Sequence, residues 1–180
     1  QVEYFKNLSK DRIIFILQTK NHIPCGVISF SLINNIKKSA QFAIVKDNTI
    51  EPELKGISAL ESVALLIEHG FEDLNLKRIT AYQHIGLRGW QSRLELLGFK
   101  LEGIYENLFV KGNEIANAQS ITCIYDDYCK IKKFRNNKIW DSKIKMLDRI
   151  NKLPKNKFFD VLNELFENEK KDYYEKIFSL

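Results

Sequence analysis

Apolar and polar positions along the chain follow two different periods, and each period predicts a different kind of element. The segments 12–19, 25–32 and 39–46 are rich in apolar and β-branched residues, and short polar turns separate them. Runs of this kind joined by short turns are typical of antiparallel hairpins. The stretch DNTIEPEL, which follows the third run, contains a proline and is expected to form a surface loop.

From Ile57 to Phe71, apolar residues recur at steps of three and four, which predicts an amphipathic helix. Segment 76–83 then returns to strand character. Segment 85–97 predicts a second helix, because Trp90 and three leucines fall on one of its faces.

Two longer strands, 99–113 and 114–127, follow and are joined through KGNE, with Gly112 as the turn residue. The predicted order is therefore β-β-β-α-β-α-β-β. A helix between two strands implies a parallel crossover, whereas hairpins are antiparallel. The sequence thus predicts the α/β (α+β) class, with a mixed, mostly antiparallel central sheet flanked by helices.

The strand pattern ends after residue 128. Three later segments have helical character, and Pro154 interrupts the series; they are 139–153, 158–168 and 172–180. We therefore divide the chain into a domain over residues 1–127 and a helical C-terminal extension over residues 128–180. Whether the extension packs on the core or offers a surface to partners stays open at this point.

Composition sets further bounds. The chain is 44% hydrophobic, with twelve Phe and seven Tyr, which is enough to fill a core. It contains no run of about 18 apolar residues that could span a membrane, and no signal peptide with basic, apolar and small regions. The chain begins at Gln1 rather than at a methionine, so we expect that an upstream part is missing.

The three cysteines are Cys25, Cys123 and Cys129, an odd number without a C-x-x-C pair. Cys25 and Cys123 lie in apolar, strand-like runs and are expected to be buried free thiols. No spacing of cysteine and histidine indicates zinc, so we expect no metal. These features predict a reduced, cytoplasmic protein.

The formal net charge of +5 is unevenly distributed. Eleven Lys and Arg residues lie between Lys130 and Lys157, against Asp141 and Asp148 alone. Such a cluster can be the footprint of nucleic acid. These cations alternate with apolar residues, however, as in an amphipathic helix that packs on something, and no aromatic stacking platform accompanies them. Nucleic acid is therefore the less favoured partner.

Five stretches between Phe15 and Tyr128 occur in an order that characterises one enzyme superfamily. They are PCGVISF, AQFAIVK, GISALESVALLIEHGFEDLNLKRITAY, LELLGFKLEGIYENLFVKGNE and SITCIYDDY. GFEDLNLKRI followed by LGFKLEG is the most specific part. On these motifs the chain resembles the GNAT superfamily of N-acetyltransferases. Within it, the chain resembles the branch of ribosomal-protein N-terminal acetyltransferases and bacterial amino-sugar N-acetyltransferases. The resemblance implies that the family's first strand and helix would precede Gln1.

The resemblance implies acetyl-CoA as cosubstrate. The family binds the pyrophosphate at a helix N-terminus, where unpaired N–H groups and the positive end of the helix dipole face the anion. Its loop has the pattern Gln/Arg-x-x-Gly-x-Gly/Ala, and the matching stretch here is 53–58. Gly56 and the small Ser58 fit this pattern, whereas Glu53 departs from it and Lys55 offsets its charge. The implied cofactor-binding residues are Ile44, Val45, Lys46, Lys55, Gly56, Ile57, Ser58, Ala59 and Arg93.

In the family, the strand that matches 42–46 diverges from the next strand, and its backbone binds the pantetheine arm. A thioester oxygen that gains charge needs a hydrogen-bond donor, so the resemblance implies an oxyanion site at the backbone of Ile44 and Val45. Two side chains depart from the family. It usually has Asn at the position of Leu87 and often Tyr at the position of Leu94, and leucine has neither donor nor acceptor.

An ammonium group must lose a proton before it attacks a thioester, so the transfer needs a base. Tyr82 and His84 end the strand that lies before the second helix, near the expected fork of the sheet. Both are candidate catalytic residues, and His84 has the better intrinsic pKa. The residues expected to bind the acceptor are Gln41, Glu106 and Asn107.

The leading hypothesis is a bacterial, acetyl-CoA-dependent N-acetyltransferase. Its slightly favoured acceptor is a nucleotide-linked amino sugar in surface-glycan synthesis, and a protein N-terminus or a small amine is the alternative. The rival class is a GNAT fold that no longer catalyses and docks nucleic acid or protein through its basic C-terminal helices; Leu87, Leu94 and Glu53 support that hypothesis. The expected partner is a small-molecule amine, with no membrane, and a homodimer stays open.

Overall fold

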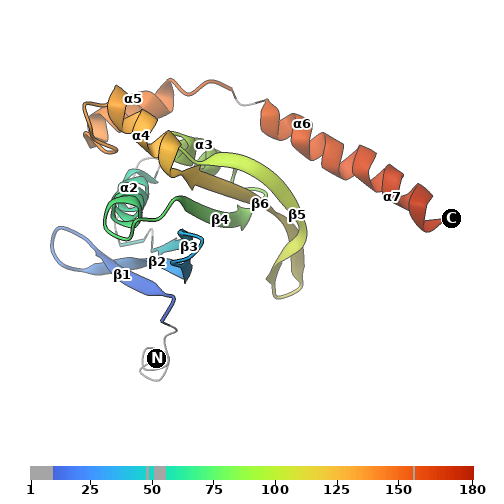
Figure 1. The fold of residues 1–180 in the computed structure, drawn as a ribbon, viewed down its shortest axis with the longest axis horizontal. Helices are drawn as coiled ribbons and strands as arrows, with labels where there is room; N and C mark the ends of the chain where they lie inside the picture. The colour runs from blue at the N-terminus through green and yellow to red at the C-terminus, as the bar shows by residue number, and fades with distance from the viewer. Residues whose placement is uncertain (1–9, 48, 51–55, 156) are drawn as a thin grey trace.

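A computed structural model of the chain describes residues 10–47, 49–50, 56–155 and 157–180. Its six strands form one sheet in the order β1-β2-β3-β4-β6-β5 (Figure 1). The strands are β1 Ile13–Gln18, β2 Pro24–Asn34, β3 Ser39–Lys46, β4 Arg78–His84, β5 Lys100–Lys111 and β6 Glu114–Ile124. Only β3 and β4 pair in parallel among these strands, which confirms the predicted mixed, mostly antiparallel sheet.

The helices are α2 Ile57–Glu72, α3 Arg88–Glu95, α4 Tyr125–Phe134, α5 Lys143–Asn151, α6 Phe158–Glu164 and α7 Lys170–Phe178, with a π-helical turn η2 over Leu165–Glu169. The predicted closing strand over 114–127 is too long. It ends at Ile124, where the Tyr125 N–H turns to donate to the Lys77 carbonyl and α4 begins.

The two predicted helices 158–168 and 172–180 are one continuous helix, made of α6, η2 and α7. The residues between them, 169–171, are Glu and Lys, which are good helix formers and let the helix continue. None of the described helices is long and apolar enough to cross a membrane.

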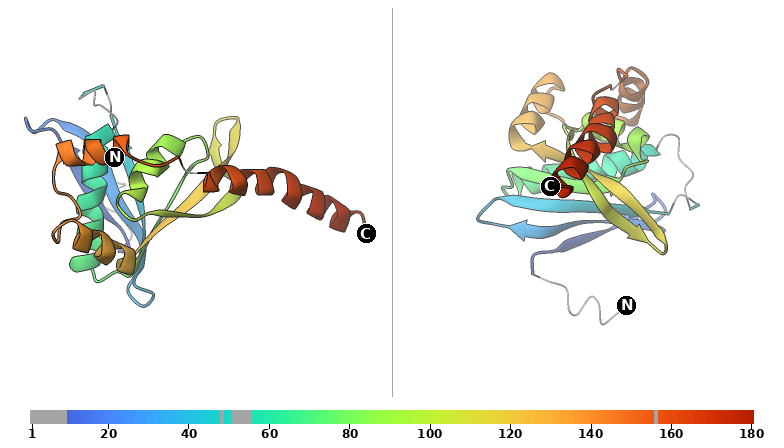
Figure 2. Two further views of the ribbon diagram at one scale, coloured as in Figure 1. Left: turned by 90° about the horizontal axis from the view of Figure 1, so that it is seen from above. Right: turned by 90° about the vertical axis from the view of Figure 1, so that its right-hand side faces the viewer.

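The core lies between one face of the sheet and α2. Every second strand residue faces this helix, and Phe30, Phe42, Ile79 and Ile121 are buried there. Gly70 lets α2 lie close to the sheet, because a Cβ at this position would stand 2.7 Å from the Phe30 ring. Helices α2, α3, α4 and α5 lie on this side of the sheet, whereas the helix from Phe158 onward extends past the end of the sheet (Figure 2).

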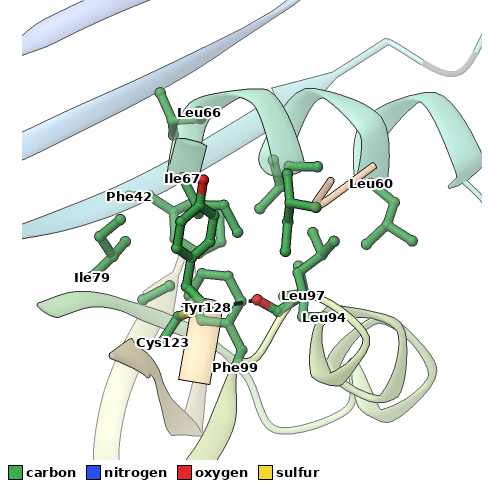
Figure 3. Packing of buried hydrophobic residues seen from close by; sticks show 14 of the residues in the cluster. Phe42, Leu60, Leu66, Ile67, Ile79, Leu94, Leu97, Phe99, Cys123 and Tyr128 are labelled. Carbon is green, nitrogen blue, oxygen red and sulfur yellow. Dashed lines mark hydrogen bonds between the residues drawn. The ribbon is translucent and has the colours of Figure 1, made fainter. Parts of the chain in front are cut away.

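Helix α3 closes one end of the core with leucines. Leu94 and Leu97 are completely buried and point toward Phe99 (Figure 3). The Cys123 thiol donates to the Leu97 carbonyl over 3.5 Å, and burial raises the pKa of this thiol to about 12. Cys25 is also buried and free, as predicted. The position at which the family often has a tyrosine is therefore occupied by core packing in this chain.

The C-terminal extension has two parts. Tyr128, Ile139 and Met146 are buried in the main cluster, so α4 and α5 pack on the core beside α2 (Figure 1). The helix from Phe158 onward leaves the core, and every residue after Lys170 is exposed (Figure 2). The first part of the C-terminal extension thus packs on the core, and the second part leaves its surface exposed. The domain boundary at residue 127 stays a prediction.

An ion pair links the last turn of α5 to the residue just before its N-cap. Arg149 Nη1 and Nη2 donate to the two Asp141 carboxylate oxygens over 2.6 and 2.7 Å, and the Ser142 N–H donates to the same carboxylate over 3.1 Å. The Asp141 side chain is only 13% exposed. The hydrogen bonds from Arg149 outweigh burial and hold the pKa of Asp141 well below its usual value.

We expect Asp141→Asn to lower the free energy of unfolding at pH 7 by about 1–2 kcal/mol, a loss between the values typical of exposed and of buried ion pairs. Because the folded-state pKa is depressed, this stability is present above the unfolded pKa of about 3.9 and is lost as the pH falls through the folded value. Denaturant melts should therefore give a difference from wild type that shrinks at acid pH. The control is Asp148→Asn, since the Asp148 pair with Lys152 is exposed; an equal loss there would contradict the prediction.

Candidate functional site

The parallel pairing of β3 and β4 stops halfway along both strands. The register runs from Ser39 opposite Arg78 to Gln41 opposite Thr80. Beyond these residues, the remaining part of β3 pairs with β2 and the remaining part of β4 pairs with β6. In the described part of the chain, no pair joins the two strands further along. The sheet therefore opens into a fork between residues 42–46 and 81–84, as the resemblance implies.

The hydrogen-bond register decides which backbone groups point into this fork. The Asp47 N–H donates to the Cys25 carbonyl over 2.8 Å, and Val45 lies opposite Val27. Because bonded and non-bonded pairs alternate along an antiparallel ladder, the backbone of Val45 faces β2 and that of Ile44 faces the fork. Of the two residues predicted for the oxyanion site, Ile44 is thus the one whose N–H is directed toward β4.

Three elements meet at the N-terminus of α2. Gly56 caps this helix with φ 62°, and no side chain caps its first N–H groups. Lys46 from β3 donates to the Ser58 hydroxyl in the first turn. Arg93 from α3 is also close, because its Nη1 lies 3.6 Å from the point that a Cβ on Gly56 would occupy, with Trp90 at 3.8 Å.

This junction can hold an anion. The uncapped N–H groups of Ile57, Ser58 and Ala59 begin a helix of 16 residues, whose dipole favours negative charge at this end. Two cations lie beside them, and a side chain at position 56 would be strained at positive φ. The residues present therefore fit the pyrophosphate of acetyl-CoA. The predicted residues Glu53 and Lys55 lie outside the described residues.

A cavity of about 700 Å³ lies on the other face of the sheet, away from α2. Gln41, Thr80 and Tyr82 line it at the fork, and Glu102 and Tyr105 line it from β5. The structure thus brings the predicted Gln41 and Tyr82 together. Sequence reasoning missed Thr80 and Tyr105. Thr80 could have been found, since it lies between these two on the same face of the predicted sheet.

Tyr82 and Tyr105 contact each other edge to face, with ring centroids 5.1 Å apart and an interplanar angle of 77°. The hydrogen bond between their hydroxyls, with burial as a smaller contribution, raises the pKa of Tyr82. Its phenol therefore stays protonated at neutral pH. The protonated phenol can donate a proton but cannot serve as the base, and its raised pKa makes it a weaker acid than a free tyrosine.

The carboxylate in the cavity wall is already engaged. Glu102 accepts hydrogen bonds from Arg78 Nη1 over 3.1 Å and from the Thr122 hydroxyl over 2.9 Å. Partial burial favours its neutral form, but the hydrogen bonds from Arg78 and Thr122 prevail and lower the pKa of Glu102. Glu102 is consequently ionised and held in place by its partners. It therefore forms part of the cavity lining and is a poor candidate for the general base.

His84 follows Tyr82 on the same strand face but does not line this cavity. Its Nδ1 accepts the Gly86 N–H over 3.0 Å, and its Nε2 lies 3.2 Å from Glu114 Oε1. Its ring packs edge to face against Phe109. The neutral imidazole therefore carries its proton on Nε2, toward the carboxylate.

The other two residues predicted for the acceptor site lie elsewhere. Glu106 and Asn107 line a separate cavity of about 680 Å³ against the C-terminal helix. Lys170 Nζ lies 3.3 Å from Glu106 Oε2, and the Asn107 N–H donates to Asn117 Oδ1. The structure does not bring them together with Gln41. Among the described residues, no three His, Cys, Asp or Glu side chains cluster closely enough to hold a metal ion.

No protein-family model and no curated protein matches this chain. Several solved structures match this chain in fold. A SpeG spermidine N-acetyltransferase mutant from Vibrio cholerae matches with a TM-score of 0.63 and 20% identity, over 71% of this chain and 74% of that chain. A mutant spermidine/spermine N-acetyltransferase SpeG from the same organism matches with a TM-score of 0.63 and 20% identity, over 71% and 75%.

A third structure, described as "Probable acetyltransferase", matches with a TM-score of 0.59 and 19% identity, over 69% of this chain and 66% of that chain. These likenesses concern the fold. They confirm that the chain has the GNAT-like acetyltransferase fold predicted from its sequence.

We expect Arg93→Gln to weaken the binding of inorganic pyrophosphate roughly tenfold, because a charged donor is lost beside the α2 N-terminus. Isothermal titration at low ionic strength measures this affinity. Arg88→Gln is the matched control on the same helix, since Arg88 pairs with Asp160 and lies 4.1 Å from the Phe159 ring. Equal affinities of wild type and Arg93→Gln would show that the anion does not bind here.

Proposed function

We propose that this chain is an acetyl-CoA-dependent N-acetyltransferase whose acceptor is a small primary amine. The observation that carries the proposal is the fork between β3 and β4. It joins an anion site at the α2 N-terminus, on the helix side of the sheet, to the cavity of Gln41 and Tyr82 on the opposite side. A cosubstrate with an anionic end and a long thioester arm matches this path.

The proposed reaction is a direct transfer. The amine nitrogen attacks the acetyl carbonyl carbon, so a C–N bond forms and the C–S bond breaks. The Ile44 N–H, which faces the fork, donates to the carbonyl oxygen as it gains charge. The amine gives up a proton, and the departing thiolate takes one from the Tyr82 phenol, which is protonated at neutral pH and regains a proton from solvent after the transfer.

His84 is our candidate for the group that accepts the proton of the amine. It stands two residues beyond Tyr82 on the same face of β4. Its Nδ1 accepts the Gly86 N–H, and its Nε2 lies 3.2 Å from Glu114 Oε1 without a hydrogen bond among the described residues. Base catalysis by His84 therefore requires that the Gly86 contact opens, which is compatible with the way catalytic contacts tighten only around substrate.

The choice of acceptor class rests on the cavity and the relatives. Two of the solved structures that share the fold are spermidine acetyltransferases, which supports the small-amine alternative more than the amino sugar favoured from the sequence. A cavity of about 700 Å³ also falls within the range of small-molecule sites, roughly 300–1,000 Å³. Tyr82 and Tyr105 offer aromatic edges and hydroxyls to such a ligand.

An acceptor panel tests this proposal. We expect acetyl transfer from acetyl-CoA to small amines at rates above those for peptides with free N-termini, because the cavity is of small-molecule size. Release of free CoA measures the rate, with spermidine, glucosamine and a nucleotide-linked amino sugar as separate arms. Faster transfer to peptides would contradict the small-amine assignment. Absence of CoA binding by the chain would instead support the rival class, a fold that no longer catalyses.

A second expectation concerns Tyr82. Tyr82→Phe should lower kcat roughly a hundredfold, because general acid catalysis is typically of this size, and should leave the affinity for acetyl-CoA nearly unchanged. Tyr105→Phe is the matched control: it removes the hydrogen-bond partner but keeps the acid, so its loss should be much smaller. Similar kcat values for wild type and Tyr82→Phe would remove Tyr82 from the mechanism.

A further inference from the structure

Two glutamines stand side by side in the core with unsatisfied amides. Gln83 of β4 lies opposite Gln119 of β6, and the two residues are 8% and 0% exposed. Gln83 Nε2 and both amide atoms of Gln119 have no hydrogen-bond partner among the described residues. A buried amide without a partner costs free energy, so native proteins rarely keep one without a use.

The register places Gln83 at the fork. Gln41 lies opposite Thr80 at the last parallel pair, so Gln83 is level with Ile44, three residues further along each strand. The side chains of both residues lie on the helix side of the sheet, since Gln83 alternates with the exposed Tyr82. Gln83 therefore stands on the helix side of the open fork, level with the Ile44 N–H that points into it.

The neighbouring helix α3 and its N-cap supply no polar side chain at Leu87 and Leu94, the two positions where the family usually or often has one. Leu94 is core, and Leu87 carries no polar group. A thioester arm that passes through the fork would thus meet no polar side chain from these two positions. Gln83 is buried on the same side of the sheet and has donor capacity to spare.

We propose that the Gln83 amide hydrogen-bonds an amide group of the pantetheine arm of acetyl-CoA, and that Gln119 is a positioning residue behind it. This inference rests on the proposed function. A primary amide carries two donors and an acceptor, and the arm contains two amide groups with the complementary pattern. A bond between the two glutamines alone would still leave donors of both without a partner.

A third buried glutamine provides the contrast. Gln91 of α3 is 2% exposed, but its Nε2 donates to Glu95 Oε1 over 2.5 Å. Its amide is satisfied within the chain and is therefore structural. Gln91→Leu is thus a matched control for Gln83→Leu, with the same chemical change at a similar burial.

The experiment compares two ligands by isothermal titration. CoA carries the pantetheine arm, whereas adenosine 3′,5′-bisphosphate offers a nucleotide end without it. We expect Gln83→Leu to bind CoA about five- to tenfold more weakly than wild type, the size of one lost hydrogen bond, and to bind the bisphosphate equally well. Gln119→Leu should show the same split with a smaller loss, and Gln91→Leu no loss for either ligand.

Thermal melts of the ligand-free protein give a second readout. Gln83→Leu should melt no lower than wild type, because an unsatisfied amide is replaced by an apolar group of similar size. Unchanged CoA affinity, or an equal loss for both ligands, would overturn the role of Gln83 while leaving the proposed function standing. If wild type binds neither ligand, the proposed function itself fails, and this inference with it. If Gln83→Leu does not fold, Gln83→Asn replaces it, because its shorter side chain keeps the amide but withdraws it from the arm. It should then weaken CoA binding and leave bisphosphate binding unchanged, and equal CoA affinity would overturn the role of Gln83.

Discussion

The geometry of the site depends on one broken ladder, the parallel pairing of β3 and β4 that stops at Gln41 and Thr80. Up to that pair the two halves of the sheet are one surface, and α2 can pack across both. Beyond it, β3 still pairs with β2 and β4 still pairs with β6, so both strands stay in the sheet although the edges that face each other are unpaired. Backbone groups with no partner in the described chain are thereby available inside a rigid sheet. Rigid placement of donors is what stabilisation of a developing charge requires.

The fork also explains why the site has two sides. The crossover from β3 through α2 to β4 puts the helix N-terminus on one face of the sheet, and this helix is the next regular element after the diverging strand. Residues of alternate parity, such as Tyr82, project from the other face, where no described helix covers them (Figure 2). Positive charge and helix dipole are thus separated from the tyrosine pair by the thickness of the sheet. An extended molecule with a charged end and a reactive end suits this separation.

Much of the fold could be predicted from the sequence because the strand and helix periods are distinct up to Ile124. The proximity of Gly56 and Arg93 also followed, but only from the family resemblance, which assigned both residues to the cofactor site. The tyrosine pair and the glutamine pair did not. The glutamine pair depends on the register between β4 and β6. The tyrosine pair depends also on β5, whose ladder with β6 shifts twice, between Leu101 and Gly103 and between Tyr105 and Phe109. A shift of one residue moves a side chain to the other face, and no local pattern reveals it.

Helix α3 carries a consequence for how this sequence can change. Leu94 is completely buried with Leu97 and Phe99, so a tyrosine there would have to place a larger ring and a hydroxyl inside the core. The residue that the family often uses for chemistry could return only together with several compensating substitutions. Core packing therefore limits which substitutions position 94 tolerates. Residues of the strands that face the fork can change reactivity without disturbing the core.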